Sequence, residues 1–270
     1  MPAPQPELPT QPPAVTRLES ADEIREAIAA KLAAVKPAGE VEVSPFKPMQ
    51  RPPMAVLVIV DDGQDDGERF RIRGDSCIIG RVEGDVKIPH DGRISSKHAS
   101  ITRTLEQGRY RWRLTDLQST NGTWVRISNS VLKADQEIMI GGRRFRFHAG
   151  MPAAPPEEVS ATKATIGWKS VAVEQALPAL VELSADVEVK RFPLADGDTW
   201  IGRNPACNVV LADDMLVNGR HAKIYRDEKN RWVIENAQSG NGTWLRIDHI
   251  AFDRTCHFQL GEQRFIVRIS

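Results

Sequence analysis

From residue 54 onward, apolar and polar positions of the chain alternate with a period of two, as in strands with one buried face. The alternation covers residues 69–73, 109–114, 143–147, 187–192, 231–235 and 263–267. Residues 54–60 form a nearly continuous apolar run, which is typical of a buried strand. Turn-forming Gly, Asn and Asp separate these runs, and no helical period lies between them. The pattern predicts an all-β fold of antiparallel sandwiches, with rings facing inward and arginines facing outward.

Proline placement separates two further segments from the strand-rich part. Of the 18 prolines, 11 lie before residue 54, and three more lie between residues 152 and 156. Because proline lacks an N–H donor and has a fixed φ, these segments are predicted to be a flexible tail, residues 1–53, and a linker, residues 150–176. Within the tail, a capping box at residues 20–23 precedes apolar residues at helical spacing, which predicts a short amphipathic helix at about 21–36. This helix is expected to dock a partner, pair with a second chain, lie on a globular unit, or stay weakly ordered.

One constellation occurs twice in the strand-rich part: Gly-Arg, then a loop ending in His-Ala, then Asn-Gly-Thr-Trp. The first copy has its arginine, histidine and asparagine at Arg81, His98 and Asn121, and the second at Arg203, His221 and Asn241. The offsets between the copies are 122, 123 and 120 residues. Three separated blocks at nearly one offset predict two copies of one module, residues 54–149 and 177–270.

Length and charge limit the classes of function. The chain has 270 residues, enough for two domains that each bury a core of their own. It contains 36 Lys and Arg and 36 Asp and Glu, so it lacks the basic surplus typical of proteins that bind nucleic acid or anionic membranes. No apolar run is long enough for membrane insertion, and the N-terminus lacks the apolar core of a secretion signal. These features predict a cytoplasmic protein.

Cysteine and histidine spacing gives no metal or catalytic motif. The three cysteines, Cys77, Cys207 and Cys256, are expected to be ordinary thiols in a reducing compartment. The six histidines form no HExxH pair. No nucleophile, metal or cofactor constellation is evident, so the sequence predicts a protein that is not an enzyme and needs no cofactor.

The repeated blocks resemble the forkhead-associated (FHA) domain, a β-sandwich that recognises phosphothreonine peptides. The resemblance is close over about residues 54–150 and weaker over about residues 178–270. A phosphothreonine carries a charge near −2 and three acceptor oxygens, so its receptor needs a cation and neutral donors. Arg81 would supply a bidentate cation and Ser95 a hydroxyl donor. Asn121-Gly122 is a strong hairpin signal, which places Asn121 at a tight loop tip.

The resemblance assigns further roles within the first copy. It implies that Thr120 and Asn121 contact the phosphothreonine and its backbone, that Arg93 faces the residues after it, and that Lys97 adds charge at the rim. The resemblance also implies that His98 braces the loops from beneath. No acid completes a catalytic triad with it. The residues expected to support the two sites are Gly80, His98, Gly122, Gly202, His221 and Gly242.

The second copy departs from this pattern. Arg203 and Asn241 remain, but Asn218 stands at the Ser95 position, Leu216 at the Arg93 position and Gly240 at the Thr120 position. A carboxamide still donates hydrogen bonds, so the second copy is expected to bind phosphothreonine weakly or with a different preference. The alternative is a scaffold that contacts a protein partner or the first copy.

Taken together, the sequence predicts a phosphothreonine-binding adaptor in Ser/Thr-kinase signalling. Its partners would be phosphothreonine proteins, either a kinase or a kinase substrate. The alternative is a phosphate-independent docking component of a larger assembly, for example one for secretion. A further hypothesis is self-association or folding back of the tail, with Thr10 or Thr16 phosphorylated and bound near Arg81.

Overall fold

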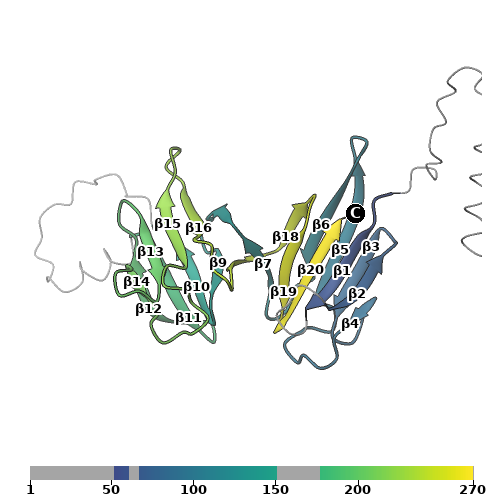
Figure 1. Cartoon of the computed structure of the whole chain (residues 1–270), viewed down its shortest axis with the longest axis horizontal. Coiled ribbons are helices and arrows are strands. Elements are labelled where there is room, and N and C mark those ends of the chain that lie inside the picture. Colours follow the sequence, from purple (N-terminus) through teal and green to yellow (C-terminus); the bar gives the residue numbers. More distant parts are fainter. Residues whose placement is uncertain (1–51, 61–66, 151–176, 270) are drawn as a thin grey trace, which may run out of the picture. The chain divides into compact units, whose positions relative to one another are not determined.

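The computed structural model describes residues 52–60, 67–150 and 177–269 (Figure 1). The described residues form strands and loops without a helix, as the all-β prediction requires. The predicted tail helix at 21–36 and nearly all of the predicted linker lie outside the described residues. Among the residues described, no helix has the length and hydropathy to cross a membrane.

The described residues form twenty strands, ten in each repeat. The first repeat forms β1 (Ala55–Val60), β2 (Glu68–Ile72), β3 (Ser76–Gly80), β4 (Val86–Lys87), β5 (Ala99–Glu106), β6 (Arg109–Asp116), β7 (Thr123–Ile127), β8 (Asn129–Val131), β9 (Glu137–Ile140) and β10 (Arg143–His148). The second forms β11 (Ala179–Ser184), β12 (Val187–Pro193), β13 (Thr199–Gly202), β14 (Val209–Val210), β15 (Ala222–Arg226), β16 (Trp232–Asn236), β17 (Thr243–Ile247), β18 (His249–Phe252), β19 (Cys256–Leu260) and β20 (Gln263–Ile269).

The last three strands of each repeat pair with strands of the other repeat. In the first sandwich, β18 pairs with β6, β19 with β7, and β20 with β1. In the second, β8 pairs with β16, β9 with β17, and β10 with β11. Figure 1 shows this exchange in colour, because the yellow strands β19 and β20 lie beside the dark blue strand β1. Each core is therefore shared between the repeats, contrary to the expectation that each repeat buries a core of its own.

The exchange has a local cause at the end of β7. Only Ser128 separates β7 from β8, and only Asp248 separates β17 from β18. A tight β-hairpin needs two loop residues, commonly Asn-Gly or another pair that tolerates positive φ. With one residue between the strands, the chain does not turn back and continues in extended form into the other sandwich. At the crossing, β7 and β17 pair antiparallel, with Val125 opposite Leu245.

Alternation along the strands builds most of the cores as predicted, with exceptions on β2, on β6 and on β12, where Val187 and Val189 are 64% and 57% exposed. On β6, Trp112 and Leu114 are buried, and on β10 Phe145 and Phe147 are buried. Trp112, Trp124, Trp232 and Trp244 are all at least 92% buried. The prediction that the rings of Phe70 and Tyr110 face inward is wrong, because these residues are 36% and 38% exposed. Phe70 lies on β2, the edge strand of its sheet, where no neighbouring strand covers it on one side.

The cysteines are ordinary thiols within this fold. Cys77 and Cys207 are buried and Cys256 is partly buried, and none of the three forms a disulfide. Burial raises the pKa of Cys77 and Cys256 to about 12, so both remain protonated near neutral pH. Among the described residues, no group of three or more His, Cys, Asp or Glu side chains could hold a metal ion.

Candidate functional site

Three loops of the first sandwich meet at the end of β3. They are the connection from β3 to β4, the connection from β4 to β5, and the connection from β6 to β7. The backbone N–H of Arg81 donates to the carbonyl of Ser95 at 2.9 Å. A Cβ at Gly80 would overlap the carbonyl oxygen of Ser96, so only glycine permits this approach. Gly80 thus places Arg81 directly beside the loop that carries Ser95.

Arg81 is the unpaired cation of this site. Its side chain is exposed, and its guanidinium has no hydrogen-bond or ion-pair partner among the described residues. Lys97, the other predicted cation, lies 3.1 Å from a carboxylate oxygen of Glu83, which also accepts a hydrogen bond from the Ser96 hydroxyl. The charge of Lys97 is therefore balanced locally, whereas that of Arg81 is available to a ligand.

Ser95, Thr120 and Asn121 join two of the loops. The Thr120 N–H donates to Ser95 Oγ at 3.1 Å, and Asn121 Nδ2 donates to the carbonyl of Arg93 at 2.7 Å. Because Ser95 Oγ accepts in this contact, its own hydrogen is left to donate. The structure thus brings together Arg81, Ser95, Thr120 and Asn121. One cation and a set of neutral donors in exposed loops suit an oxyanion ligand.

His98 connects the same loops from inside the protein. Its ring is completely buried, Nδ1 accepts the Ser95 N–H at 3.1 Å, and Nε2 lies 3.1 Å from the Gly122 carbonyl. This pair of contacts requires the neutral tautomer with its hydrogen on Nε2. Burial lowers the pKa of His98 below its ordinary value. A neutral, fully engaged imidazole holds the loops in place and has no free nitrogen for catalysis.

Asn121-Gly122 does not form the hairpin that its sequence suggests. Strands β6 and β7 belong to different sheets, so the loop between them crosses from one sheet to the other. Gly122 has a φ of 78°, and a Cβ there would overlap the Arg246 side chain from the second repeat. Trp124 Nε1 donates to the Asn121 carbonyl at 3.1 Å. The loop tip is therefore held by packing and hydrogen bonds and not by a two-residue turn.

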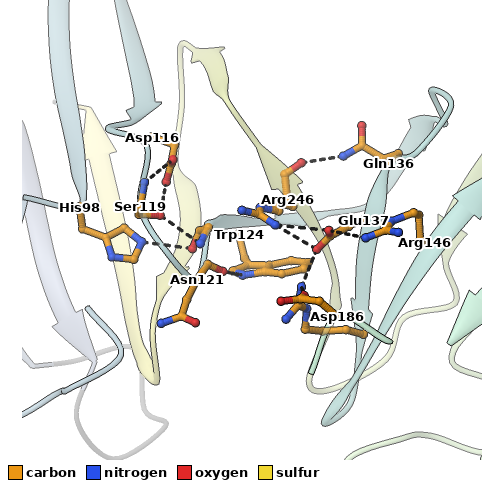
Figure 2. A network of polar contacts seen from close by, with 12 residues as sticks. His98, Asp116, Ser119, Asn121, Trp124, Gln136, Glu137, Arg146, Asp186 and Arg246 are labelled. Atoms are coloured by element: carbon orange, nitrogen blue, oxygen red, sulfur yellow. Dashed lines mark hydrogen bonds and ion pairs between the residues drawn. The ribbon is translucent and has the colours of Figure 1, made fainter. Parts of the chain in front are cut away.

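A polar network beneath the tip was not recognised from the sequence (Figure 2). Asp116 Oδ1 accepts hydrogen bonds from the hydroxyls of Ser119 and Thr123, each at 2.6 Å, and Ser119 Oγ accepts the Gly122 N–H at 3.0 Å. The signal was present, since both repeats place Ser two residues before the Asn-Gly pair and Thr directly after it.

The second repeat contributes directly to the first site. Buried Asp91 accepts the Arg93 N–H at 2.8 Å through Oδ1 and the Glu262 N–H at 2.7 Å through Oδ2. A Cβ at Gly261 would lie 2.6 Å from this carboxylate. The turn between β19 and β20 therefore packs against the loop of Arg93, and Arg93 Nε lies 3.4 Å from Glu262 Oε1. Glu262 could not be assigned from the sequence because it is distant along the chain.

The second sandwich repeats the framework with different chemistry. Asn218 Oδ1 accepts the Gly240 N–H at 3.3 Å, and Asn241 Nδ2 donates to the Leu216 carbonyl at 2.9 Å. His221 is completely buried, and its Nε2 lies 3.0 Å from the Gly242 carbonyl. A Cβ at Gly202 would overlap the Gly219 carbonyl, as at Gly80.

The cation of the second sandwich has less freedom than Arg81. Arg203 is partly buried, and its Nε is buried without a hydrogen-bond partner among the described residues. Apolar Met215 and Leu216, on the loop that carries Asn218, are 77% and 48% exposed. The rim that carries Arg93 in the first site is therefore apolar in the second.

The fold and the paired loop sites define a tandem β-sandwich recognition module. The model of the FHA domain matches the chain twice, at residues 77–141 and 199–261, so the chain carries two tandem FHA domains. Each match runs past the point where the chain crosses between sandwiches, since 77–141 extends from β3 beyond β9. Comparison with curated proteins gave no match.

Solved structures of similar fold include yeast Pml1p, at 24% identity over 41% of this chain and 75% of that chain, with a TM-score of 0.25. Mycobacterium tuberculosis EmbR in complex with a low-affinity phosphopeptide is 19% identical over 53% of this chain and 32% of that chain, with a TM-score of 0.23. A structure from work on phosphothreonine-dependent FHA domain interactions is 22% identical over 30% of this chain and 85% of that chain, with a TM-score of 0.17.

Proposed function

We propose that the protein is a phosphothreonine-binding adaptor whose competent site lies around Arg81 in the first sandwich. Arg81 and Ser95 bind the phosphate, while Thr120 and Asn121 bind the phosphothreonine and its backbone. The partner is a protein phosphorylated by a Ser/Thr kinase, or the kinase itself. The two FHA domains support this class of function, because the domain is an interaction module.

The observation that carries the proposal is the unpartnered guanidinium of Arg81. Arg93, another arginine of these loops, pairs with Glu262. Arg81 stands beside Ser95 without such a partner among the described residues. A phosphate group with a charge near −2 would meet this cation and the Ser95 hydroxyl together.

The second sandwich is proposed to bind phosphothreonine more weakly. Asn218 replaces the hydroxyl, and Arg203 is less exposed than Arg81. Its apolar rim at Met215 and Leu216 favours contact with an apolar protein surface. A phosphate-independent docking role is therefore the second candidate function, and it applies to this sandwich.

The test is a fluorescence anisotropy titration of the whole chain with a phosphothreonine peptide library. We expect a Kd on the order of micromolar for the best peptides. Arg81→Ala should weaken binding by roughly ten- to a hundredfold, since a charge-assisted hydrogen bond contributes about 1.5–3 kcal/mol. Arg203→Ala is the matched control at the equivalent position and should change this binding by less than about twofold.

Dephosphorylated peptides separate the two candidate functions. Binding through Arg81 must vanish when the phosphate is removed, whereas docking through the second sandwich must persist. Equal affinity of Arg81→Ala and the unchanged protein for every phosphopeptide would refute the proposed site.

A further inference from the structure

A single carboxylate pairs with three arginines near the Asn121 loop, one of which, Arg144, also pairs with Asp186. Glu137 on β9 is 11% exposed and lies 2.9 Å from Arg144, 3.2 Å from Arg246 and 3.5 Å from Arg146. Figure 2 shows its carboxylate between the guanidiniums of Arg146 on β10 and Arg246 on β17. Burial raises the pKa of Glu137, but its hydrogen bond from Arg144 and the charge of Arg246 lower the pKa overall. We call these four residues the Glu137 cluster.

The exchange of strands creates a second cluster at the equivalent place in the first sandwich. An offset of 120 residues relates Arg246 to Arg126, Glu137 to His257, and Arg144 to Arg264. The strand pairing agrees with this relation, since Glu137 lies opposite Arg146 and His257 lies opposite Ile266. We call Arg126, His257 and Arg264 the Arg126 cluster.

Aromatic contacts support the same equivalence. The guanidinium of Arg144 lies 5.8 Å from the Trp124 ring centre, and that of Arg264 lies 5.4 Å from the Trp244 ring centre. Two arginines of the Glu137 cluster therefore have counterparts in the same setting. Glu137 has no carboxylate counterpart, because His257 stands at the equivalent position.

Arg126 and Arg264 form no ion pair with a carboxylate among the described residues. Arg126 donates to the carbonyls of Ser239 and Gly240, at 3.1 and 3.0 Å. Burial and the nearby charge of Arg126 lower the pKa of Arg264, as expected for a cation without an adjacent anion.

A cavity of about 190 Å³ opens between these residues. It is lined by Arg126, His257 and Arg264 together with Asn241, Trp244 and neighbouring residues. Of the candidate phosphothreonine ligands of the second sandwich, Asn241 lines the cavity, whereas Arg203 and Asn218 do not. The cavity thus offers two guanidiniums and an amide where the Glu137 cluster holds an internal carboxylate.

We propose that this cavity binds a small oxyanion, in which a carboxylate or phosphate group takes the place that Glu137 fills in the other cluster. Arg126 and Arg264 bind the anion from two strands, and Asn241 lies at its edge. The site is distinct from the Arg81 site and does not depend on the proposed phosphothreonine function.

The test measures thermal unfolding of the whole chain with Arg81→Ala and Arg203→Ala combined, so that both candidate phosphothreonine sites are disabled. Inorganic phosphate and acetate are each compared with chloride at equal ionic strength, which distinguishes a phosphate from a carboxylate ligand. At about tenfold excess over Kd we expect a rise in Tm of roughly 3 °C over chloride. Arg264→Gln, added to this background, should abolish the rise, whereas Arg69→Gln on the exposed edge strand β2 should preserve it.

A second variant imitates the filled cluster. His257→Glu places a carboxylate where Glu137 stands in the other half, so it should raise Tm in chloride and remove the response to added anion. A rise in Tm that survives both Arg264→Gln and His257→Glu would overturn the proposal. Equal Tm in phosphate, acetate and chloride before these changes would also overturn it.

Discussion

Separating the two repeats removes the strands that complete each sandwich. A fragment of residues 52–150 keeps β1 to β10 but lacks β18, β19 and β20, which pair with β6, β7 and β1 in the whole chain. Strand β1 then has an open edge where β20 was paired. The fragment also carries β8, β9 and β10 without their partners from the second repeat.

The cost follows from the side chains that β19 and β20 bury. Phe258, Leu260 and Val267 are 0% exposed and Phe265 is 1% exposed, and the rings of Phe258 and Phe265 stack at 5.0 Å. Burying one such side chain stabilises a fold by about 1.5–3 kcal/mol, so the four contribute roughly 6–12 kcal/mol. This equals the whole free energy of unfolding of a typical domain, about 5–15 kcal/mol. A single open fragment is therefore not expected to fold.

Two copies of the fragment can supply the missing strands to each other. Each copy would donate β8, β9 and β10 where the whole chain uses β18, β19 and β20, which gives a symmetric exchanged dimer. Size-exclusion chromatography with light scattering should report a mass twice that of the fragment. A monomer with cooperative thermal unfolding would refute the reasoning.

A matched variant tests the cause of the exchange. Replacing Ile127 with Asn and Ser128 with Gly introduces the Asn-Gly pair that a type I′ hairpin needs. The chain can then turn back at the end of β7, and the fragment should shift toward a monomer. A dimer unchanged by both substitutions would place the cause of exchange elsewhere than in this hinge.

Three further predictions concern single groups. Glu262→Gln frees Arg93 from an exposed ion pair. Given the proposed function, peptides with an acidic residue after the phosphothreonine should then bind about two- to fivefold tighter in anisotropy titrations. An unchanged preference for acidic residues would exclude a role for the ion pair between Arg93 and Glu262. Burial lowers the pKa values of His98 and His221 from 6.5, so the unfolded state binds more protons than the folded state. The free energy of unfolding, measured in urea, should therefore fall as pH drops below about 6.5. A free energy of unfolding that stays constant from pH 7.5 to 5.5 would contradict this. Glu137→Gln removes the charge among three guanidiniums and should lower the free energy of unfolding by about 2–3 kcal/mol in the same assay, whereas no loss would mean that the cluster is dispensable for stability.

Much of the secondary structure follows from local patterns. Residues 109–114 and 143–147 alternate with a period of two, and they form β6 and β10 with their apolar side chains buried except Tyr110. The same alternation placed Phe70 inside, which is wrong, because alternation identifies a face of a strand and not whether another layer covers it. Burial at an edge depends on neighbours that lie far away in the sequence.

The sequence predicts the residues of the candidate site but not the groups that surround and support them. Arg81 and Asn121 could be named because they recur with nearly equal spacing in both repeats, whereas Ser95 and Thr120 were named from the resemblance of the first repeat to the FHA domain. The hydrogen bonds that Asp116 accepts from Ser119 and Thr123 were not predicted. Their only signal in the sequence is that Ser and Thr stand at the same spacing in both repeats. These hydrogen bonds depend on how the loop between β6 and β7 crosses from one sheet to the other.

By itself, the sequence determined that this protein has two repeats of one β-rich module and that the residues of the proposed phosphothreonine site are more complete in the first. These properties depend on residue type and short spacing, which the linear order records directly. Only the tertiary structure decided that the repeats exchange their last three strands, that Glu262 lies against Arg93, and that Arg126 and Arg264 face one cavity. The physical reason is that two equivalent repeats offer the same pairing partners twice. Which repeat supplies a strand depends on the short connection after β7 and on packing between distant segments.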